Sequence, residues 1–212
     1  MGEKKQKLWI WMALLILIFL LVLVTEDLLD KEINAFDKWA AGWFKDASNS
    51  ILEKLAVVFY YIGTAYVEIP IALLAVGYLL LKQKDRWAAG VLAGSLAGSF
   101  LLSWMMKMLL KRERPGLEHL VKADGYSFPS GHSMVGLAFY GTLCYLLYLN
   151  LKEKGKSTWH VLLIGILLVG GIGLSCVLSR VHYASDVIAG LIGGGIWLLA
   201  SILVLEYKRT ST

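Results

Sequence analysis

Charged residues are scarce in this chain of 212 residues. Only 17% of the chain is Asp, Glu, Lys or Arg, whereas a soluble domain usually carries about a quarter, and 58% is hydrophobic. The apolar residues gather into runs near the length that crosses roughly 30 Å of hydrocarbon. The composition therefore excludes a soluble globular domain and predicts a single integral membrane domain over residues 1–212.

Cysteines and clustered carboxylates are scarce as well. Cys144 and Cys176 lie in separate apolar stretches and form no CxxC, which excludes the usual zinc and redox motifs. No tight group of Asp and Glu is available to hold Mg²⁺, so we expect no metal and no other cofactor. The net charge of +5 does not indicate a nucleic-acid partner, because the basic residues flank apolar runs.

Six apolar segments predict an all-α bundle of six transmembrane helices. These segments are residues 8–25, 55–81, 87–111, 133–149, 159–178 and 187–205. The first is too long for a signal peptide and no small-residue cleavage site follows it, so residues 1–25 are expected to be a retained anchor. The second holds Glu68 and Pro70, which predict a kink or break near its outer end.

A short amphipathic segment follows the first span. Trp39, Trp43 and Phe44 are spaced as on one helix, with charged residues between them. This pattern predicts a short helix that lies in the membrane interface.

Two spans carry glycines at intervals of four residues, a spacing that lets helix backbones approach closely. We therefore expect helix contacts at these positions: Gly90, Gly94 and Gly98 in the third span, Gly190 and Gly194 in the sixth. The spacing does not predict an oligomeric state, since it fits contacts within one chain and between chains.

The distribution of basic residues predicts the orientation. If the N-terminus is cytoplasmic, four short inner segments hold Lys4, Lys5, Lys7, Lys82, Lys84, Arg86, Lys152, Lys154, Lys156, Lys208 and Arg209. The first outer loop is instead acidic. By the positive-inside rule both termini are cytoplasmic, and residues 112–132 and 179–186 face outside next to the outer leaflet of the cell membrane.

The stretch "KMLLKRERP" places cations beside a membrane span. Lys107 and Arg114 are seven residues apart and share a face if the helix continues through both. Pro115 is expected to end that helix. Two converging cations suit an anion, and a guanidinium binds phosphate with two parallel hydrogen bonds. The alternative is that these side chains only anchor the span at the lipid headgroups.

The stretch "SFPSGHS" stands at the start of the fourth span. Gly131 lets the backbone approach a ligand, the helix that follows offers free N–H groups, and Ser130 adds a hydroxyl donor. His132 is placed to give a proton to a leaving group. A plain helix N-cap with an incidental loop histidine is the alternative.

The stretch "SRVHYASD" pairs a histidine with a carboxylate. His182 and Asp186 are four residues apart and share a face if the segment is helical. A carboxylate bonded to one imidazole nitrogen makes the other more basic, which is how a nucleophile is oriented. An ordinary capping Asp beside an interfacial His is the alternative.

All three stretches fall on the outer side of the predicted topology. Together they supply cations, a helix start, a histidine backed by a carboxylate and a second histidine. These groups suit phosphoryl transfer through a histidine, with basic residues in the charge-neutralising role of a metal.

The ordered motifs resemble those of the type 2 phosphatidic acid phosphatases, over about residues 35–205. The resemblance implies that His182 is the nucleophile, that Asp186 orients it, and that His132 protonates the leaving oxygen and then activates water. It also implies a metal-independent reaction and a phosphate site formed by Lys107, Arg114, Ser130 and Gly131.

One position departs from the family pattern. The family's third motif has Arg six residues before the nucleophilic His, and here that residue is Cys176. Losing such a contact could cost several kcal/mol of transition-state stabilisation. One hypothesis is that Arg180, one helical turn further on, reaches the phosphate instead. The other is that Cys176 marks an inactive or altered variant.

We therefore expect a lipid phosphatase at the outer leaflet. Its substrate would be a lipid phosphate or diphosphate, with undecaprenyl pyrophosphate favoured over phosphatidylglycerol phosphate and phosphatidic acid. The alternative is a protein that binds or transports a phosphate-bearing lipid with little hydrolysis, because Cys176 replaces the expected Arg. A purely structural membrane protein would require three coincident motifs in the right order.

Overall fold

The structure is a computed structural model that describes residues 3–26 and 35–209. Every regular element in these two ranges is helical, as the sequence predicts. The elements are α1 (Glu3–Glu26), α2 (Ala35–Ala47), α3 (Ser50–Ile62), α4 (Ala65–Tyr78), the π-helix η1 (Leu79–Gln83), α5 (Arg86–Leu110), α6 (Gly131–Glu153), α7 (Trp159–Leu178) and α8 (Ala184–Arg209).

Six of the described helical segments are long and apolar enough to cross a membrane. They are Leu8–Glu26, Ala65–Gln83, Arg86–Leu110, Gly131–Glu153, Trp159–Leu178 and Ala184–Arg209. Five of them agree with the predicted spans to within four residues at each end.

The second span is not the single helix that the sequence predicts. Asn49 caps α3 through its side chain, and α3 ends at Ile62 with Gly63 as its C-cap; α4 starts after Thr64. The break therefore falls at Gly63 and Thr64, and Pro70 lies inside α4. The sequence predicts a break in this region correctly but attributes it to the wrong residues.

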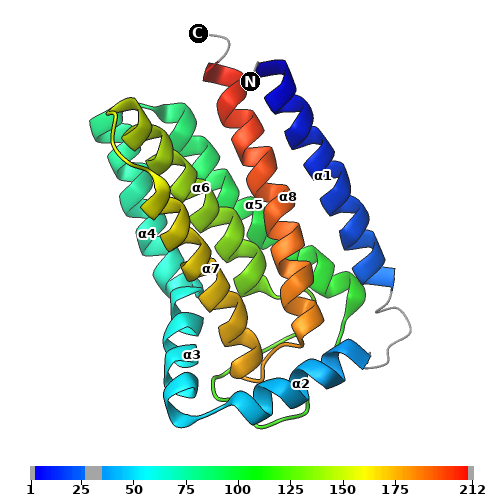
Figure 1. The fold of residues 1–212 in the computed structure, drawn as a ribbon. Coiled ribbons are helices and arrows are strands. Elements are labelled where there is room, and N and C mark those ends of the chain that lie inside the picture. The colour runs from blue at the N-terminus through cyan, green and yellow to red at the C-terminus, as the bar shows by residue number, and fades with distance from the viewer. Residues whose placement is uncertain (1–2, 27–34, 210–212) are drawn as a thin grey trace.

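The bundle is built around α6, which packs against α5, α7 and α8. Helix α1 packs on α8, while α3 packs on α7 and α4 on α5. Figure 1 shows α2 lying across the end of the bundle, against α7 and α8, as expected of the predicted interfacial helix. Its aromatic residues Trp39 and Trp43 are exposed.

The two ends of the bundle differ. Helix α1 begins and α8 ends at one end, where the connections from η1 to α5 and from α6 to α7 also lie (Figure 1). The connection from α5 to α6 and the one from α7 to α8 lie at the other end, together with α2. All three sequence motifs are at this second end, which we call the site end.

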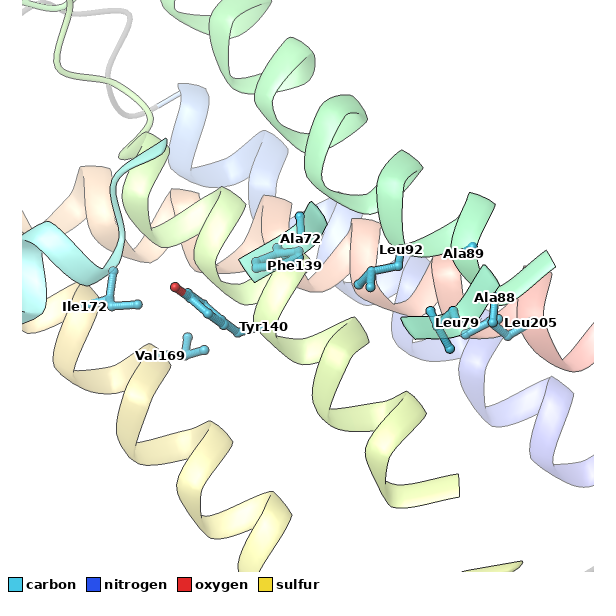
Figure 2. Packing of buried hydrophobic residues seen from close by; sticks show 10 residues of the cluster. All are labelled: Ala72, Leu79, Ala88, Ala89, Leu92, Phe139, Tyr140, Val169, Ile172 and Leu205. Carbon is cyan, nitrogen blue, oxygen red and sulfur yellow. The ribbon is translucent and has the colours of Figure 1, made fainter. Parts of the chain in front are cut away.

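A layer of apolar side chains joins the central helix to its neighbours. Figure 2 shows Phe139 and Tyr140 of α6 in this layer with Leu92 of α5 and Ile172 of α7. Phe139, Leu92 and Ile172 are fully buried. This packing fixes α6 against α5 and α7, so the start of α6 has a defined position at the site end.

Glycines bring α8 close to the start of α6. A Cβ atom on Gly190 would lie 2.5 Å from the Ser130 carbonyl oxygen, and one on Gly194 would lie 2.5 Å from that of Met134. The predicted contacts are correct there and at Gly98, which meets Trp197. Gly90 and Gly94 make no such contact within the chain, because a Cβ on either would have no atom within 4 Å.

Candidate active site

Two connections meet at the site end and carry most of the motif residues. Residues 111–130 run without helix between α5 and α6, and residues 179–183 join α7 to α8. Backbone hydrogen bonds link them, since Leu120 N–H donates to Ser179 (3.2 Å) and Ser130 N–H donates to the Asp186 carbonyl (2.9 Å). Segments distant in sequence are therefore held as one unit.

His182 is oriented by Asp186, as the sequence predicts. Its Nδ1 lies 3.5 Å from Asp186 Oδ2 and 3.3 Å from the hydroxyl of Ser127, which itself donates to Asp186. The two residues do not share a helix, because α8 begins at Ala184. Instead Tyr183 N–H donates to Asp186 Oδ2 (2.9 Å) and fixes the turn that holds His182.

The environment of His182 favours a neutral ring. Burial lowers the pKa of His182 to about 4, and the bond to Asp186 opposes that effect only in part. Because Nδ1 faces the carboxylate, the proton belongs on Nδ1 and the lone pair on Nε2. At neutral pH the side chain thus presents an unprotonated nitrogen, as a nucleophile must.

Arg114 lies next to that nitrogen. Its guanidinium donates to three carbonyl oxygens, those of Gly125 (3.1 Å), Asp124 (2.9 Å) and Val181 (2.7 Å). Nη1 lies 3.4 Å from Nε2 of His182. Burial lowers the pKa of Arg114, but guanidinium remains charged in proteins. A fixed positive charge and the nucleophilic nitrogen therefore face the same space.

Lys107 reaches the site by a different route from the one predicted. Helix α5 ends at Leu110, and Lys111 has a left-handed backbone (φ 47°), so Lys107 and Arg114 do not share a helical face. They converge because the following connection folds back. Lys107 Nζ donates to the carbonyls of Tyr126 (2.6 Å) and Ser127 (3.1 Å), next to those that bind Arg114.

The start of α6 lies between Lys107 and the third motif. Ser130 is fully buried as the N-cap of α6, and its Oγ accepts from Ser133. A Cβ on Gly131 would lie 3.4 Å from Ser103 Oγ and 3.8 Å from Lys107 Cε. The sequence motifs do not include Ser103, although it precedes Lys107 by one helical turn.

His132 lies against an aromatic ring. It stacks on Tyr60 of α3 with 4.2 Å between ring centroids. Its Nε2 is buried and has no hydrogen-bond partner among the described residues. Lys107, Arg114 and His182 are all close enough to act on its charge. The structure thus brings both histidines and both cations of the motifs to one place.

A second layer behind Asp186 was not predicted. Arg112 donates from Nη1 to Asp186 Oδ1 (2.5 Å) and from Nη2 to Asp37 Oδ2 of α2 (2.7 Å). Asp37 is buried and also accepts from Ser185 N–H (2.9 Å) and Ser185 Oγ (2.6 Å). We call Asp37, Arg112 and Ser185 the support network.

Electrostatics favour the support network. Burial alone would lower the pKa of Arg112, but the carboxylates Asp186 and Asp37 outweigh it and raise the pKa. The guanidinium also lies over the Tyr183 ring, 4.2 Å from its centroid. The sequence carries the residues but gives no sign of this arrangement, because Asp37 is far from Arg112 along the chain.

Two adjoining cavities lie along α2, and His182 lines the first of them. The first, of about 560 Å³, has a mainly apolar lining that also includes the charged residues Lys38, Lys45 and Arg180. The second, of about 410 Å³, lies between α2, α7 and α8 and is lined only by apolar residues and glycines. Both include Phe44 and Val177 in their linings, so a cavity that contains charged residues borders one that is apolar throughout.

Comparison with known proteins identifies the family of this chain. The model of the PAP2 superfamily matches residues 87–210, more than half of the chain. The chain belongs to the PAP2 superfamily. A PAP2 relative, phosphatidylglycerophosphatase B of Bacillus subtilis (strain 168), is 34% identical over 89 residues. That similarity covers 42% of this chain and 44% of the relative, less than half the length of either.

Two solved structures share the fold. The first transmembrane PAP2-type phosphatidylglycerolphosphate phosphatase from Bacillus subtilis matches with a TM-score of 0.82 and 23% identity, over 94% of this chain and 98% of that one. Aquifex aeolicus LpxE matches with a TM-score of 0.65 and 20% identity, over 83% and 98%. The predicted family and fold are confirmed.

The structure corrects one premise about the departure from the PAP2 motif. Cys176 is fully buried beside Ser130, whose hydroxyl lies 3.7 Å from Sγ, so the exchanged position does border the expected phosphate site. Helix α7 ends at Leu178, and Arg180 has φ 61°, so the helical turn assumed from Cys176 to Arg180 is wrong. The Arg180 guanidinium instead binds Glu53 of α3 at 2.9 Å.

Proposed function

We propose that this chain is a lipid phosphatase that hydrolyses a lipid phosphate or diphosphate through a phosphohistidine on His182. One observation supports this most directly: Nε2 of His182 lies 3.4 Å from Arg114 Nη1 while Nδ1 faces Asp186. A nucleophile backed by a carboxylate and facing a cation suits attack on an anionic phosphorus centre.

In the first step Nε2 of His182 attacks phosphorus and the bond to the leaving oxygen breaks. Asp186 stabilises the positive charge that develops on the ring. Arg114, Lys107, the Ser130 hydroxyl and the Gly131 N–H take the equatorial phosphate oxygens. In acyl-transfer enzymes, removing one such donor lowers kcat roughly 10²–10³-fold. His132 gives its proton to the leaving oxygen, so the lipid departs as an alcohol or a monophosphate.

In the second step water attacks the phosphohistidine. His132 accepts a proton from that water, the P–N bond breaks, and inorganic phosphate leaves. His182 returns to its neutral state and His132 to its protonated state, so one cycle consumes one water molecule. The motif resemblance implies that no metal takes part.

The substrate is proposed to be a lipid whose head reaches His182 from the outer leaflet. A cavity that combines charged and apolar residues, next to one that is wholly apolar, suits an amphiphile. Basic residues flank the helices at the end opposite the site, which by the positive-inside rule favours an outward-facing site in the cell membrane. Undecaprenyl pyrophosphate remains our first candidate. Phosphatidylglycerol phosphate is the second candidate, and it is the one that the names of a relative and of a matching structure support.

Phosphate release from several lipid phosphates and diphosphates, with purified protein and excess chelator, tests this function. We expect chelator-resistant release that disappears in His182→Ala. Tight binding of the lipid without release would instead support the alternative of a binding or transport protein.

Cys176, which stands where the family motif has Arg, is the reason to keep the alternative of a binding or transport protein. Cys176→Arg restores the family residue next to Ser130. A large increase in turnover would show that Cys176 limits catalysis. Unchanged turnover in a variant that stays folded would show that the site does not depend on an Arg there.

A further inference from the structure

A third cavity, of about 700 Å³, lies at the end of the bundle opposite the site end. It is formed by α4, η1, α5, α6 and α8, and no residue of the three sequence motifs lines it. Its volume falls in the range of roughly 300–1,000 Å³ that is typical of ligand sites. The proposed phosphatase reaction gives this cavity no role.

The lining of this cavity changes from apolar to charged along the helices. On α6 it passes from Leu143 to Glu153, and on α8 from Leu205 to Lys208. From α4 through η1 the lining ends at Lys84, in the turn that leads to α5. Because the charged residues stand at the helix ends, a molecule that fills the cavity would have its apolar part deeper in the bundle and its polar part outermost.

Buried side chains close the deep part of the cavity. Figure 2 shows Leu79 of η1, Ala88 of α5 and Leu205 of α8 close together. They belong to the same buried cluster as Leu92 and Phe139, and each is at most 6% exposed. This part of the cavity therefore suits a hydrocarbon chain, since a polar group would lack hydrogen-bond partners there.

The two carboxylates in the lining are already engaged by the protein. Asp85 is the N-cap of α5 and accepts hydrogen bonds from the N–H groups of Trp87 (3.0 Å) and Ala88 (2.9 Å). Glu153 accepts a hydrogen bond from Nη2 of Arg209 (2.7 Å). Neither carboxylate is therefore directed at a cationic ligand.

Cations outnumber carboxylates in the lining. Lys84, Lys208 and Arg209 line the cavity against the two carboxylates, so the excess charge is positive. The Lys208 ammonium lies over the Trp87 ring, 5.7 Å from its centroid, and the Lys84 side chain is exposed. Basic pockets between transmembrane helices on the cytoplasmic side are typical sites for anionic lipid headgroups. The charge and the apolar interior together fit such a lipid.

We propose that this cavity binds one anionic phospholipid of the leaflet opposite the site end. An acyl chain lies between the helices, and the phosphate is bound by Lys84 and Lys208. By the positive-inside rule we expect this leaflet to be cytoplasmic. The wall of the cavity includes η1, and π-helical turns are rare and frequent at functional sites. The lipid site does not depend on the proposed phosphatase function.

Thermal unfolding of the purified protein in detergent micelles, with phosphatidylglycerol or phosphatidylcholine added, tests this site. We expect phosphatidylglycerol to raise the melting temperature by roughly 2–4 °C more than phosphatidylcholine, because a ligand that binds only the folded protein stabilises it. The double variant Lys84→Gln/Lys208→Gln should lose this difference. Lys156→Gln removes an exposed cation at the same end but outside the lining, so this matched control should keep it.

A second variant tests the apolar part without changing the charge. Ala75 of α4 lines the cavity and is only partly buried, so Ala75→Phe should fold and place a ring where the acyl chain would lie. We expect the preference for phosphatidylglycerol to be lost here too. Leu74→Phe is the matched control and should keep the preference, because Leu74 is 77% exposed and lies outside the lining.

The remaining outcomes would overturn the lipid site. Equal shifts from the two lipids would mean that the headgroup charge is not read. A preference that survives in the double variant would place the lipid elsewhere, and a preference lost equally in Lys156→Gln would reflect general attraction to a basic surface. A dimer in lipid-free micelles that Ala75→Phe dissociates would assign the cavity to a second copy of the chain.

The lipid site and the phosphatase can fail separately. Phosphate release from lipid substrates tests the phosphatase alone, and the melting temperatures test the cavity alone. A preference for phosphatidylglycerol that is lost in both cavity variants and kept in both controls supports the lipid site.

Discussion

The two histidines of the site have unlike surroundings. His182 is held by Asp186 and Ser127, and behind Asp186 lies the support network. His132 rests on Tyr60, and its Nε2 has no hydrogen-bond partner among the described residues. One histidine is fully oriented by the protein before any ligand arrives. The other has a free nitrogen for the substrate.

This difference fits the two roles that we propose. A nucleophile must be aimed accurately, and misplacing it by about 1 Å can lower the rate about 10²-fold. An acid that serves two steps must exchange protons with the leaving oxygen and then with water. It is therefore less constrained by fixed hydrogen bonds. The following changes test that distinction.

Replacing Asp186 should have the largest effect. Asp186→Asn keeps the shape but removes the charge that faces His182 Nδ1 and Arg112. We expect kcat to fall about 10³-fold, because the wrong tautomer is favoured and the ring loses its counter-charge. This loss should be equal on phosphatidic acid, whose leaving oxygen needs a proton, and on p-nitrophenyl phosphate, whose phenolate leaves without one. A loss confined to phosphatidic acid would contradict the proposed difference between the roles of His182 and His132.

The protonation of His182 is the next test. Since burial lowers its pKa to about 4, the ring is neutral above that pH and becomes charged only as the pH falls through it. NMR titration of ¹⁵N-histidine-labelled protein in micelles, with His182→Ala to assign the signal, should give a midpoint near 4. A midpoint near 6.5 would mean that the ring is not buried as described.

Weakening the support network should have a moderate effect. Asp37→Asn removes the charge opposite Arg112 but leaves all motif residues in place. We expect kcat to fall about tenfold with KM little changed, because Arg112 then holds Asp186 less firmly. Glu113→Gln, which changes an exposed carboxyl next to Arg112 in sequence, is the control and should keep full activity. Equal activity of both variants would show that α2 does not support the site.

Arg180→Ala should have the smallest effect. Arg180 binds Glu53 in a pair of which each side chain is about a third exposed. Such pairs contribute at most about 1 kcal/mol to stability. We expect a slightly lower melting temperature and a kcat within about twofold of wild type. A fall of about 10²-fold would instead revive the hypothesis that Arg180 replaces the missing Arg at 176.

Sequence patterns predicted the helices well, because long apolar runs determine where the chain crosses the membrane. They placed the break in the second span less well. The break lies at Gly63, the C-cap of α3, whereas Pro70 lies inside α4. The motifs identified Lys107 and Arg114 correctly as neighbours in space. Their convergence nevertheless depends on a folded-back connection rather than on a shared helix face.

The residues that were missed share one property. Asp37 and Arg112 act on His182 through Asp186, and Ser127 contacts both His182 and Asp186. Their partners lie far along the chain, so no local spacing reveals them. The helical turn assumed between Cys176 and Arg180 was wrong for a related reason, because α7 ends at Leu178 and Arg180 has a left-handed backbone.

The covalent intermediate is the most direct test of the central claim. Protein incubated with a ³²P-labelled lipid phosphate and quenched in alkali should carry label on His182, stable to base, lost in acid and absent from His182→Ala. His132→Ala should still accumulate some label on a substrate with a good leaving group, because it removes only the proton-transfer residue. Phosphate release with no label on His182 under single-turnover conditions, or label in His182→Ala, would contradict the account.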